Sequence, residues 1–235
     1  MNKEEFYEAL SENLVIELDS KQKKQLDKFY KLLIEWNQKI NLTAIKEEKD
    51  VYLKHFYDSL TVVKSTNLKR PISLCDVGSG AGFPGIVLKI VFPNLKVTLV
   101  DSLNKRVMYL QEIIKELGLE NIEAVHSRME DYSRLNKEKF NVITARAVAD
   151  LNTLVEISIN SLRVGGKLVF MKANCKEEIA NLRRIASKLN IMVEDVNNFR
   201  LPIEESARTL ISVIKLSETK PIYPRTSYKI KKNPL

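Results

Sequence analysis

The apolar positions in the first 70 residues recur at steps of three and four, which is the spacing of one face of an α-helix. Asp19 or Ser20 can cap such a helix. The apolar positions that follow this cap are Leu26, Phe29, Tyr30, Leu33, Trp36 and Ile40. A similar spacing over residues 51–63 predicts a further helix. We therefore predict an N-terminal helical region over residues 1–70.

From residue 71 onward, short apolar runs alternate with helical patterns. The runs predict buried strands at 72–77, 97–100, 122–125, 140–145 and 167–171. The helices between them are expected from about residue 84, over 104–117, over 151–162 and over 176–189. Asn104 is the expected cap and Gly118 the expected stop of the second helix, and Gly165-Gly166 the stop of the third.

Two late strands, at 191–197 and 209–214, have no clear helix between them, which predicts an antiparallel pair at one edge of the sheet. The alternation as a whole predicts an α/β fold with a doubly wound, mostly parallel, Rossmann-like sheet. We assign it to a main domain over residues 71–218. In such sheets, ligands bind beyond the carboxyl ends of the strands.

The net charge of +8 is unevenly placed along the 235 residues. The C-terminal tail, residues 219–235, has no acid and carries Lys220, Arg225, Lys229, Lys231 and Lys232. A basic arm on a nearly neutral body is typical of proteins that bind a polyanion, although a solvated basic tail has the same composition.

Several classes of protein are excluded by composition. The two cysteines, Cys75 and Cys175, cannot build a disulfide framework, and the two histidines lack the spacing of a metal site. The acidic N-terminus has no apolar core like that of a signal peptide, and the apolar stretch 86–92 is too short to span a membrane. We expect a monomeric cytoplasmic protein with no membrane partner and no metal.

A glycine-rich loop follows the first predicted strand. Gly80, Gly82 and Gly85 satisfy the dinucleotide pattern G-x-G-x-x-G, which leaves a nicotinamide-dependent oxidoreductase as one hypothesis. Read from Asp76, the loop is D-x-G-x-G-x-G and resembles the first motif of class I S-adenosylmethionine-dependent methyltransferases. Asp101 follows Gly80 by 21 residues, where an acid accepts hydrogen bonds from a ribose. Both interpretations imply an adenosine ligand, and the acid at Asp76 favours the methyl donor because it would repel a pyrophosphate.

The residues after the third and fourth strands indicate the rest of the site. Met129 and Glu130 offer an apolar face and a hydrogen-bond acceptor to an adenine. Arg146 ends the fourth strand and can bind a base or a phosphate, so it is the candidate catalytic residue. Methylation of a guanine N7 suits such a site because this lone pair needs no general base. His55 and Asp58, three residues apart on a helix, are expected to make a surface or interdomain polar contact.

The ordered series of motifs is more specific than the loop alone. It comprises Trp36-Asn37, Asn41-Leu42-Thr43-Ala44-Ile45, His55-x-x-Asp58-Ser59-Leu60, the segment Asp76 to Gly85, Asp101-Ser102-x-x-Lys105-Arg106 and Tyr223-Pro224-Arg225. This series resembles the bacterial small-subunit ribosomal RNA guanine-N7 methyltransferases, also called glucose-inhibited division protein B. The resemblance covers nearly the whole chain.

The resemblance implies a donor, a substrate and a set of site residues. The donor is S-adenosylmethionine, and the acceptor is one guanine N7 of 16S rRNA, guanine 527 by family convention. The partner is 16S rRNA in the small ribosomal subunit or in its assembly intermediate. The donor site would comprise Gly78, Gly80, Phe83, Asp101, Met129, Glu130 and Arg146. The residues expected to bind RNA are Lys105, Arg106, Lys172, Arg208 and Arg225. A ribosome-associated RNA-binding protein with a vestigial nucleotide pocket is the alternative.

Overall fold

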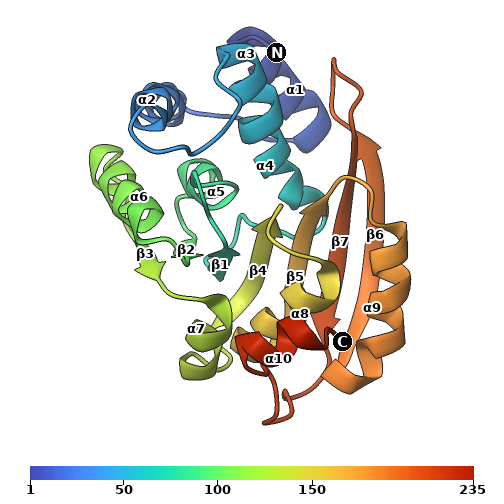
Figure 1. Ribbon diagram of the computed structural model, residues 1–235. Helices are drawn as coiled ribbons and strands as arrows, with labels where there is room; N and C mark the ends of the chain where they lie inside the picture. Colours follow the sequence, from blue (N-terminus) through green and yellow to red (C-terminus); the bar gives the residue numbers. More distant parts are fainter.

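A seven-stranded sheet forms the centre of the computed structural model, which describes residues 1–235 (Figure 1). The strand order is β3-β2-β1-β4-β5-β7-β6, and β1 to β5 are parallel. The strands are β1 Ser73–Val77, β2 Lys96–Asp101, β3 Ile122–His126, β4 Phe140–Arg146, β5 Leu162–Lys172, β6 Ile191–Arg200 and β7 Ala207–Lys215. Both β5 with β7 and β6 with β7 pair antiparallel. The predicted fold class and the predicted antiparallel edge pair are thereby confirmed.

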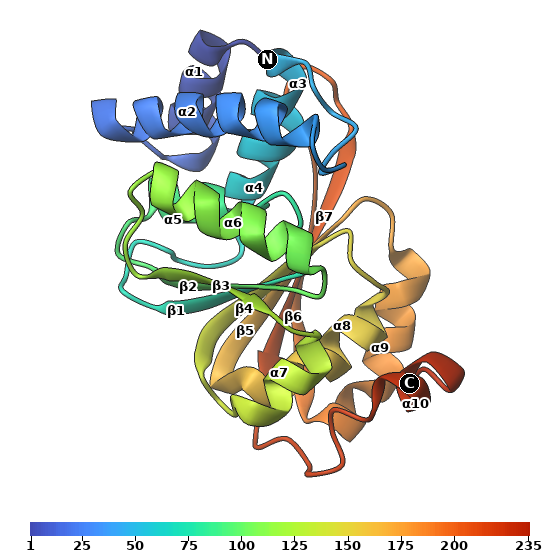
Figure 2. The same ribbon diagram turned by 60° about the vertical axis from the view of Figure 1, so that its left-hand side comes forward.

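Helices cover both faces of the sheet (Figure 2). The helices α5 (Gly85–Val91) and α6 (Asn104–Glu116) lie on one face, beneath the N-terminal helices. The opposite face carries α7 (Met129–Leu135), α8 (Leu151–Ser158), α9 (Lys176–Leu189) and the short C-terminal α10 (Ser227–Lys232). None of the helices combines the length and the apolar character needed to cross a membrane.

The N-terminal helices share a hydrophobic core with the sheet. They are α1 (Lys3–Leu14), α2 (Ser20–Asn37), α3 (Glu48–Val51), a π-helical turn (Tyr52–Tyr57), α4 (Asp58–Leu60) and a 3₁₀ turn (Thr61–Lys64). Asp19 caps α2, as predicted, because its side chain accepts the N–H of Gln22. Phe29 of α2 packs at 5.6 Å from Phe56 and 5.4 Å from Phe83, measured between ring centroids. The helical region is therefore packed directly against the loop that follows β1.

Two predicted element boundaries are wrong. The helix over 151–162 ends earlier, at Ser158 and a 3₁₀ turn Ile159–Ser161, and β5 begins at Leu162 and runs through both glycines. Gly165 has a φ of +75°, so it bends the strand where the pairing with β4 shifts register. Asn104 is not a cap, because Leu103 holds that position and Asp101 Oδ1 accepts the N–H of Leu103.

The basic tail is not a free arm. Ile230 of α10 is only 5% exposed, and it belongs to the hydrophobic cluster beneath α8 and α9. The C-terminal residue Leu235 accepts a hydrogen bond at its backbone oxygen from Asn152 Nδ2, at 2.6 Å. The tail therefore folds back on the body of the molecule, next to α8 (Figure 1).

Candidate functional site

A cavity of about 260 Å³ lies beyond the carboxyl ends of the first strands. Gly78 and Ser102 line it from the segments after β1 and β2, and Met129 and Glu130 line it from the start of α7. Val148 closes it from the loop after β4. This is the edge of an open parallel sheet at which ligands bind.

Gly78 has to be glycine for two reasons. Its φ is +66°, a conformation that residues with a Cβ rarely adopt. A Cβ at this position would also lie 2.6 Å from Cγ2 of Val148, inside any normal contact distance. The loop thus brings bare backbone to the wall of the cavity, where a ligand can approach it closely.

Asp101 holds the glycine loop in place through a hydrogen bond. Its carboxylate is 3% exposed and accepts the N–H groups of Gly80 and Leu103, both at 2.9 Å. Arg106 Nη1 lies 3.7 Å from the same carboxylate. Val100 and Ser102, the chain neighbours of Asp101, line the cavity. The side chain of Asp101 is instead bonded to the backbone of the glycine loop. A direct bond from Asp101 to a ribose therefore stays a prediction.

Asp76 is fully buried under the same loop. Oδ2 accepts the N–H of Gly85 at 3.0 Å, and Oδ1 has no hydrogen-bond partner. Burial raises the pKa of Asp76 to about 7. The first acid of the D-x-G-x-G-x-G pattern therefore holds the loop from inside the protein.

Arg146, at the end of β4, is held by the N-terminal helical region. Its Nη1 donates to the backbone oxygen of Lys54 at 2.9 Å and to Asp58 Oδ2 at 3.2 Å. Its Nη2 lies 3.0 Å from His55 Nδ1. The guanidinium also lies over the ring of Phe83, 5.1 Å from the centroid. These contacts use three of the five N–H donors of Arg146 and leave two without a partner in the structure.

His55 is a neutral acceptor in this cluster. Because the guanidinium can only donate, Nδ1 accepts from Arg146, and the proton on Nε2 points to Thr43 Oγ1 at 2.9 Å. Burial, with the charge of Arg146, lowers the pKa of His55 to about 3. The imidazole stacks on Phe83 with ring centroids 4.4 Å apart. His55 is therefore uncharged at neutral pH and fixed on both edges.

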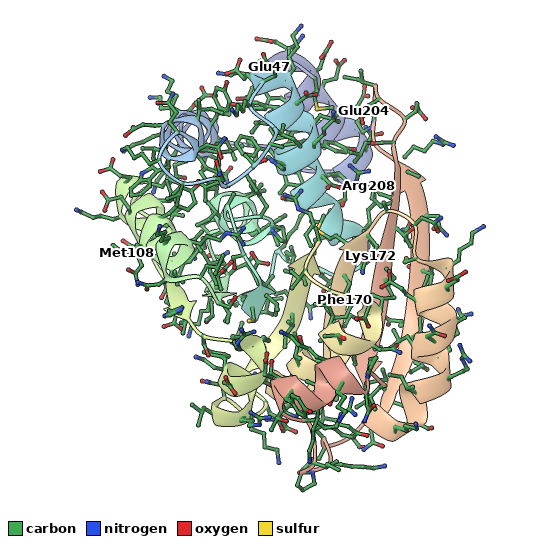
Figure 3. The ribbon with its side chains drawn as sticks, in the orientation of Figure 1. Glu47, Met108, Phe170, Lys172, Glu204 and Arg208 are labelled. Carbon is green, nitrogen blue, oxygen red and sulfur yellow. The ribbon has the colours of Figure 1, made fainter.

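Asp58 links two arginines. It is 4% exposed, and its Oδ1 accepts from Arg208 Nε at 3.2 Å while Oδ2 accepts from Arg146. Arg208 comes from β7, beside the helical segment that holds Asp58 (Figure 3). The predicted polar contact of His55 and Asp58 is thus present, and both side chains make it with Arg146, the candidate catalytic residue at the end of β4. Their spacing of three was the only signal of this role in the sequence.

The five predicted RNA-binding residues differ in how far other residues of the protein occupy them. Lys105 is exposed at the start of α6, and Arg106 lies beside Asp101. Lys172 is occupied by the backbone oxygen of Ala149 at 2.7 Å and by Glu178 at 2.8 Å. Arg208 is held by Asp58.

Arg225 is held by partners within the molecule, and its assignment to RNA binding stays a prediction. Its Nε and Nη2 donate to the buried carboxylate of Glu156 at 2.6 and 2.7 Å, and its Nη1 donates to the backbone oxygen of Asn233. The Glu156 side chain is 1% exposed, so it requires this counter-charge. Arg225 therefore anchors the tail through three of its five N–H groups.

Solved structures place the fold in a class. A "SAM dependent methyltransferase" from Aquifex aeolicus superposes with a TM-score of 0.53 and 21% identity, covering 72% of this chain and 94% of that chain. NSun6 from Pyrococcus horikoshii gives a TM-score of 0.57 at 16% identity, covering 75% of this chain and 57% of that one. The fold is that of the class I S-adenosylmethionine-dependent methyltransferases.

Sequence comparison identifies the family within this class. The profile of the GidB family, described as "rRNA small subunit methyltransferase G", matches residues 22–207. "Ribosomal RNA small subunit methyltransferase G" from Staphylococcus epidermidis is 45% identical, over 97% of this chain and 98% of the relative. The protein of the same name from Streptococcus pyogenes serotype M12 is 45% identical over the full length of both. The chain belongs to the GidB family, whose methyl donor is S-adenosylmethionine.

The residues around the cavity fit this donor. Gly78, with its φ of +66°, brings backbone without a side chain to the wall of the cavity. Met129 and Glu130, both buried, combine an apolar surface with a carboxylate acceptor, as an adenine with its amino group requires. The charge of Arg146 lies at the neighbouring strand end.

Proposed function

We propose that this protein transfers a methyl group from S-adenosylmethionine to N7 of a single guanine in 16S rRNA. The observation that carries the proposal is the 45% identity over the whole chain to a ribosomal RNA small subunit methyltransferase G. The cavity, with Gly78, Met129 and Glu130 on its walls, is the proposed donor site. The substrate would be the small ribosomal subunit or an assembly intermediate, and the enzyme would act as a monomer in the cytoplasm.

The side chains around Arg146 suit a reaction that requires alignment and no base. S-adenosylmethionine, when bound, supplies the electrophilic methyl group. The guanine N7 lone pair lies in the ring plane and attacks without deprotonation. His55 already accepts from Arg146, and Asp58 is paired with two arginines, so neither is a free general base. The task left to the protein is to place the guanine in line with the methyl group.

Arg146 is proposed to orient the guanine through its O6 oxygen. A donor aimed at N7 would occupy the lone pair that has to attack, whereas O6 accepts a hydrogen bond without blocking it. Two N–H groups of Arg146 are free for this contact. The bonds to Lys54, Asp58 and His55 fix the guanidinium beforehand, so that little side-chain entropy is lost when the base binds.

The test is transfer of labelled methyl from S-adenosylmethionine to small subunits that lack this modification, followed by nucleoside analysis. The expected product is 7-methylguanosine at one site of 16S rRNA. Arg146→Lys should lower the rate by about tenfold or more at saturating donor, since an ammonium cannot replace a fixed fork of donors. Arg163→Lys, an exposed arginine on β5, is the matched control and should leave the rate unchanged.

Three results would contradict the proposal in different ways. Label in another nucleoside would exclude the guanine N7 as the acceptor. Donor binding without transfer to any form of the subunit would favour an RNA-binding protein with a vestigial pocket. Binding of a nicotinamide cofactor in place of S-adenosylmethionine would favour the dinucleotide interpretation of Gly80, Gly82 and Gly85.

A further inference from the structure

The C-terminal helix α10 contributes to the wall of the cavity. Ser227, Ile230 and Lys231 line the same space as Met129 and Glu130 of α7. In both ribbon views, α10 lies beside α8 on the face of the sheet that carries α7 (Figures 1 and 2). The cavity is therefore built from segments about 100 residues apart in the chain, and one of them is the tail.

Buried polar contacts hold the tail in this position. Besides the two side-chain bonds from Arg225, Glu156 Oε1 accepts the backbone N–H of Arg225 at 3.1 Å. Arg134 of α7 donates to the backbone oxygen of Pro224 at 3.0 Å. The bond from Asn152 to Leu235 fixes the other end of α10. An arm that only attracted RNA by its charge would need none of these anchors.

The chemistry of the α10 face suits an adenosine. Ile230 is 5% exposed and belongs to the same apolar cluster as Met129 and Ile157, both of which also line the cavity. A flat heteroaromatic ring is well held between apolar surfaces, with a few polar groups that fix its orientation. Glu130 and Ser227 line the cavity and provide such polar groups.

We infer that α10 is part of the donor-binding site, with Ile230 contacting the adenine of S-adenosylmethionine together with Met129. This inference rests on the proposed donor site and assigns it three residues of the tail, Ser227, Ile230 and Lys231. The tail is thereby a ligand-binding element of the methyltransferase. Its anchoring residue, Arg225, is a positioning residue that acts through α10.

The first test is calorimetric titration of the full-length protein with S-adenosylmethionine. Ile230→Ala should weaken binding by roughly 4- to 15-fold, as expected when one or two buried methyl or methylene groups no longer contact a ligand. The matched control is Ile185→Ala on α9, which removes the same atoms from the same apolar cluster and is 6% exposed, away from the cavity. Equal affinities for the two variants, both within twofold of the parent protein, would overturn the inference.

A second measurement requires no substitution in the core. Amide hydrogen exchange of the parent protein, with and without S-adenosylhomocysteine, should slow in residues 227–232 and stay unchanged in residues 180–189 of α9. Slowing of exchange at 129–135 without any change at 227–232 would overturn the inference.

Lys231→Ala and Lys232→Ala are a matched pair of surface substitutions, since both side chains are exposed and only Lys231 lines the cavity. Donor affinity should fall with Lys231→Ala alone.

These experiments separate the inference from the proposed function. If the parent protein does not bind S-adenosylmethionine, the donor assignment itself fails. If it binds, and Gly78→Ala abolishes binding while Ile230→Ala does not, the donor site stands and only the role of α10 falls. A tail that only binds RNA would give a third pattern. Substitutions in the tail would leave the affinity for the donor unchanged. They would reduce the slope of log RNA affinity against log salt concentration by about 0.7 for each lost phosphate contact to single-stranded RNA.

Discussion

His55 is buried as a neutral imidazole between Arg146 and Thr43, so its titration opposes folding at acidic pH. In the unfolded chain its pKa is the ordinary value of 6.5, and in the folded protein its pKa is about 3. Below pH 6.5 the unfolded state binds a proton that the folded state does not. The free energy of unfolding therefore falls as the pH falls.

The expected magnitude follows from these two pKa values. Between pH 7 and pH 5, the titration of His55 alone should lower the free energy of unfolding by about 2 kcal/mol. Asp76 contributes with the opposite sign, because its folded pKa of about 7 lies above its ordinary value of 3.8. Its stabilising effect is present below pH 3.8 and is lost as the pH rises through 7. The two groups must therefore be separated by a variant.

His55→Asn provides this separation. Asparagine keeps a polar side chain and does not titrate, and Asp76 is present in both proteins, so its effect cancels in the difference. Urea unfolding of both proteins at pH 7 and pH 5 gives the four free energies that are needed. The parent should lose about 2 kcal/mol more than the variant on acidification. Parallel pH dependence of the two proteins would refute the neutral, Arg146-bound His55.

Three other substitutions test separate parts of the site. Gly78→Ala should weaken donor binding by about tenfold or more in calorimetry, since the strained φ and the contact with Val148 displace the loop. Asp101→Ala should weaken donor binding by about 1–3 kcal/mol, and unchanged affinity would remove Asp101 from the site. Arg225→Met should lower the free energy of unfolding by about 3–5 kcal/mol because Glu156 would stay buried without its partner. A loss below about 1 kcal/mol would mean that the pair is solvated.

The parts of the fold that the sequence predicts well are those encoded by local pattern. Each parallel strand is a short apolar run, and the loop after β1 carries its glycines at consecutive alternate positions, so both are recognisable without knowledge of the contacts. The sequence does not predict the beginning of β5, because Gly165 and Gly166 normally stop a helix and only the pairing of Leu162 and Lys167 with β4, on either side of them, makes them part of a strand.

The contacts that the sequence does not predict are those between distant residues. Arg225 pairs with Glu156, which is 69 residues away, and a basic residue in a basic tail has no local sign of a buried partner. His55 and Asp58 are recognisable as a pair on one helix, but nothing in their segment indicates that Arg146, about 90 residues later, lies between them. Composition shows the charge of the tail but not the contacts that hold the tail against the body of the molecule.

A crystal structure with bound S-adenosylhomocysteine tests the central claim most directly. We expect the adenine in the cavity against Met129 and Glu130, the backbone of Gly78 in contact with the amino-acid portion, and the sulfur on the side of Arg146. Density for the ligand at any other place in the molecule, or an adenine turned away from Met129 and Glu130, would contradict it.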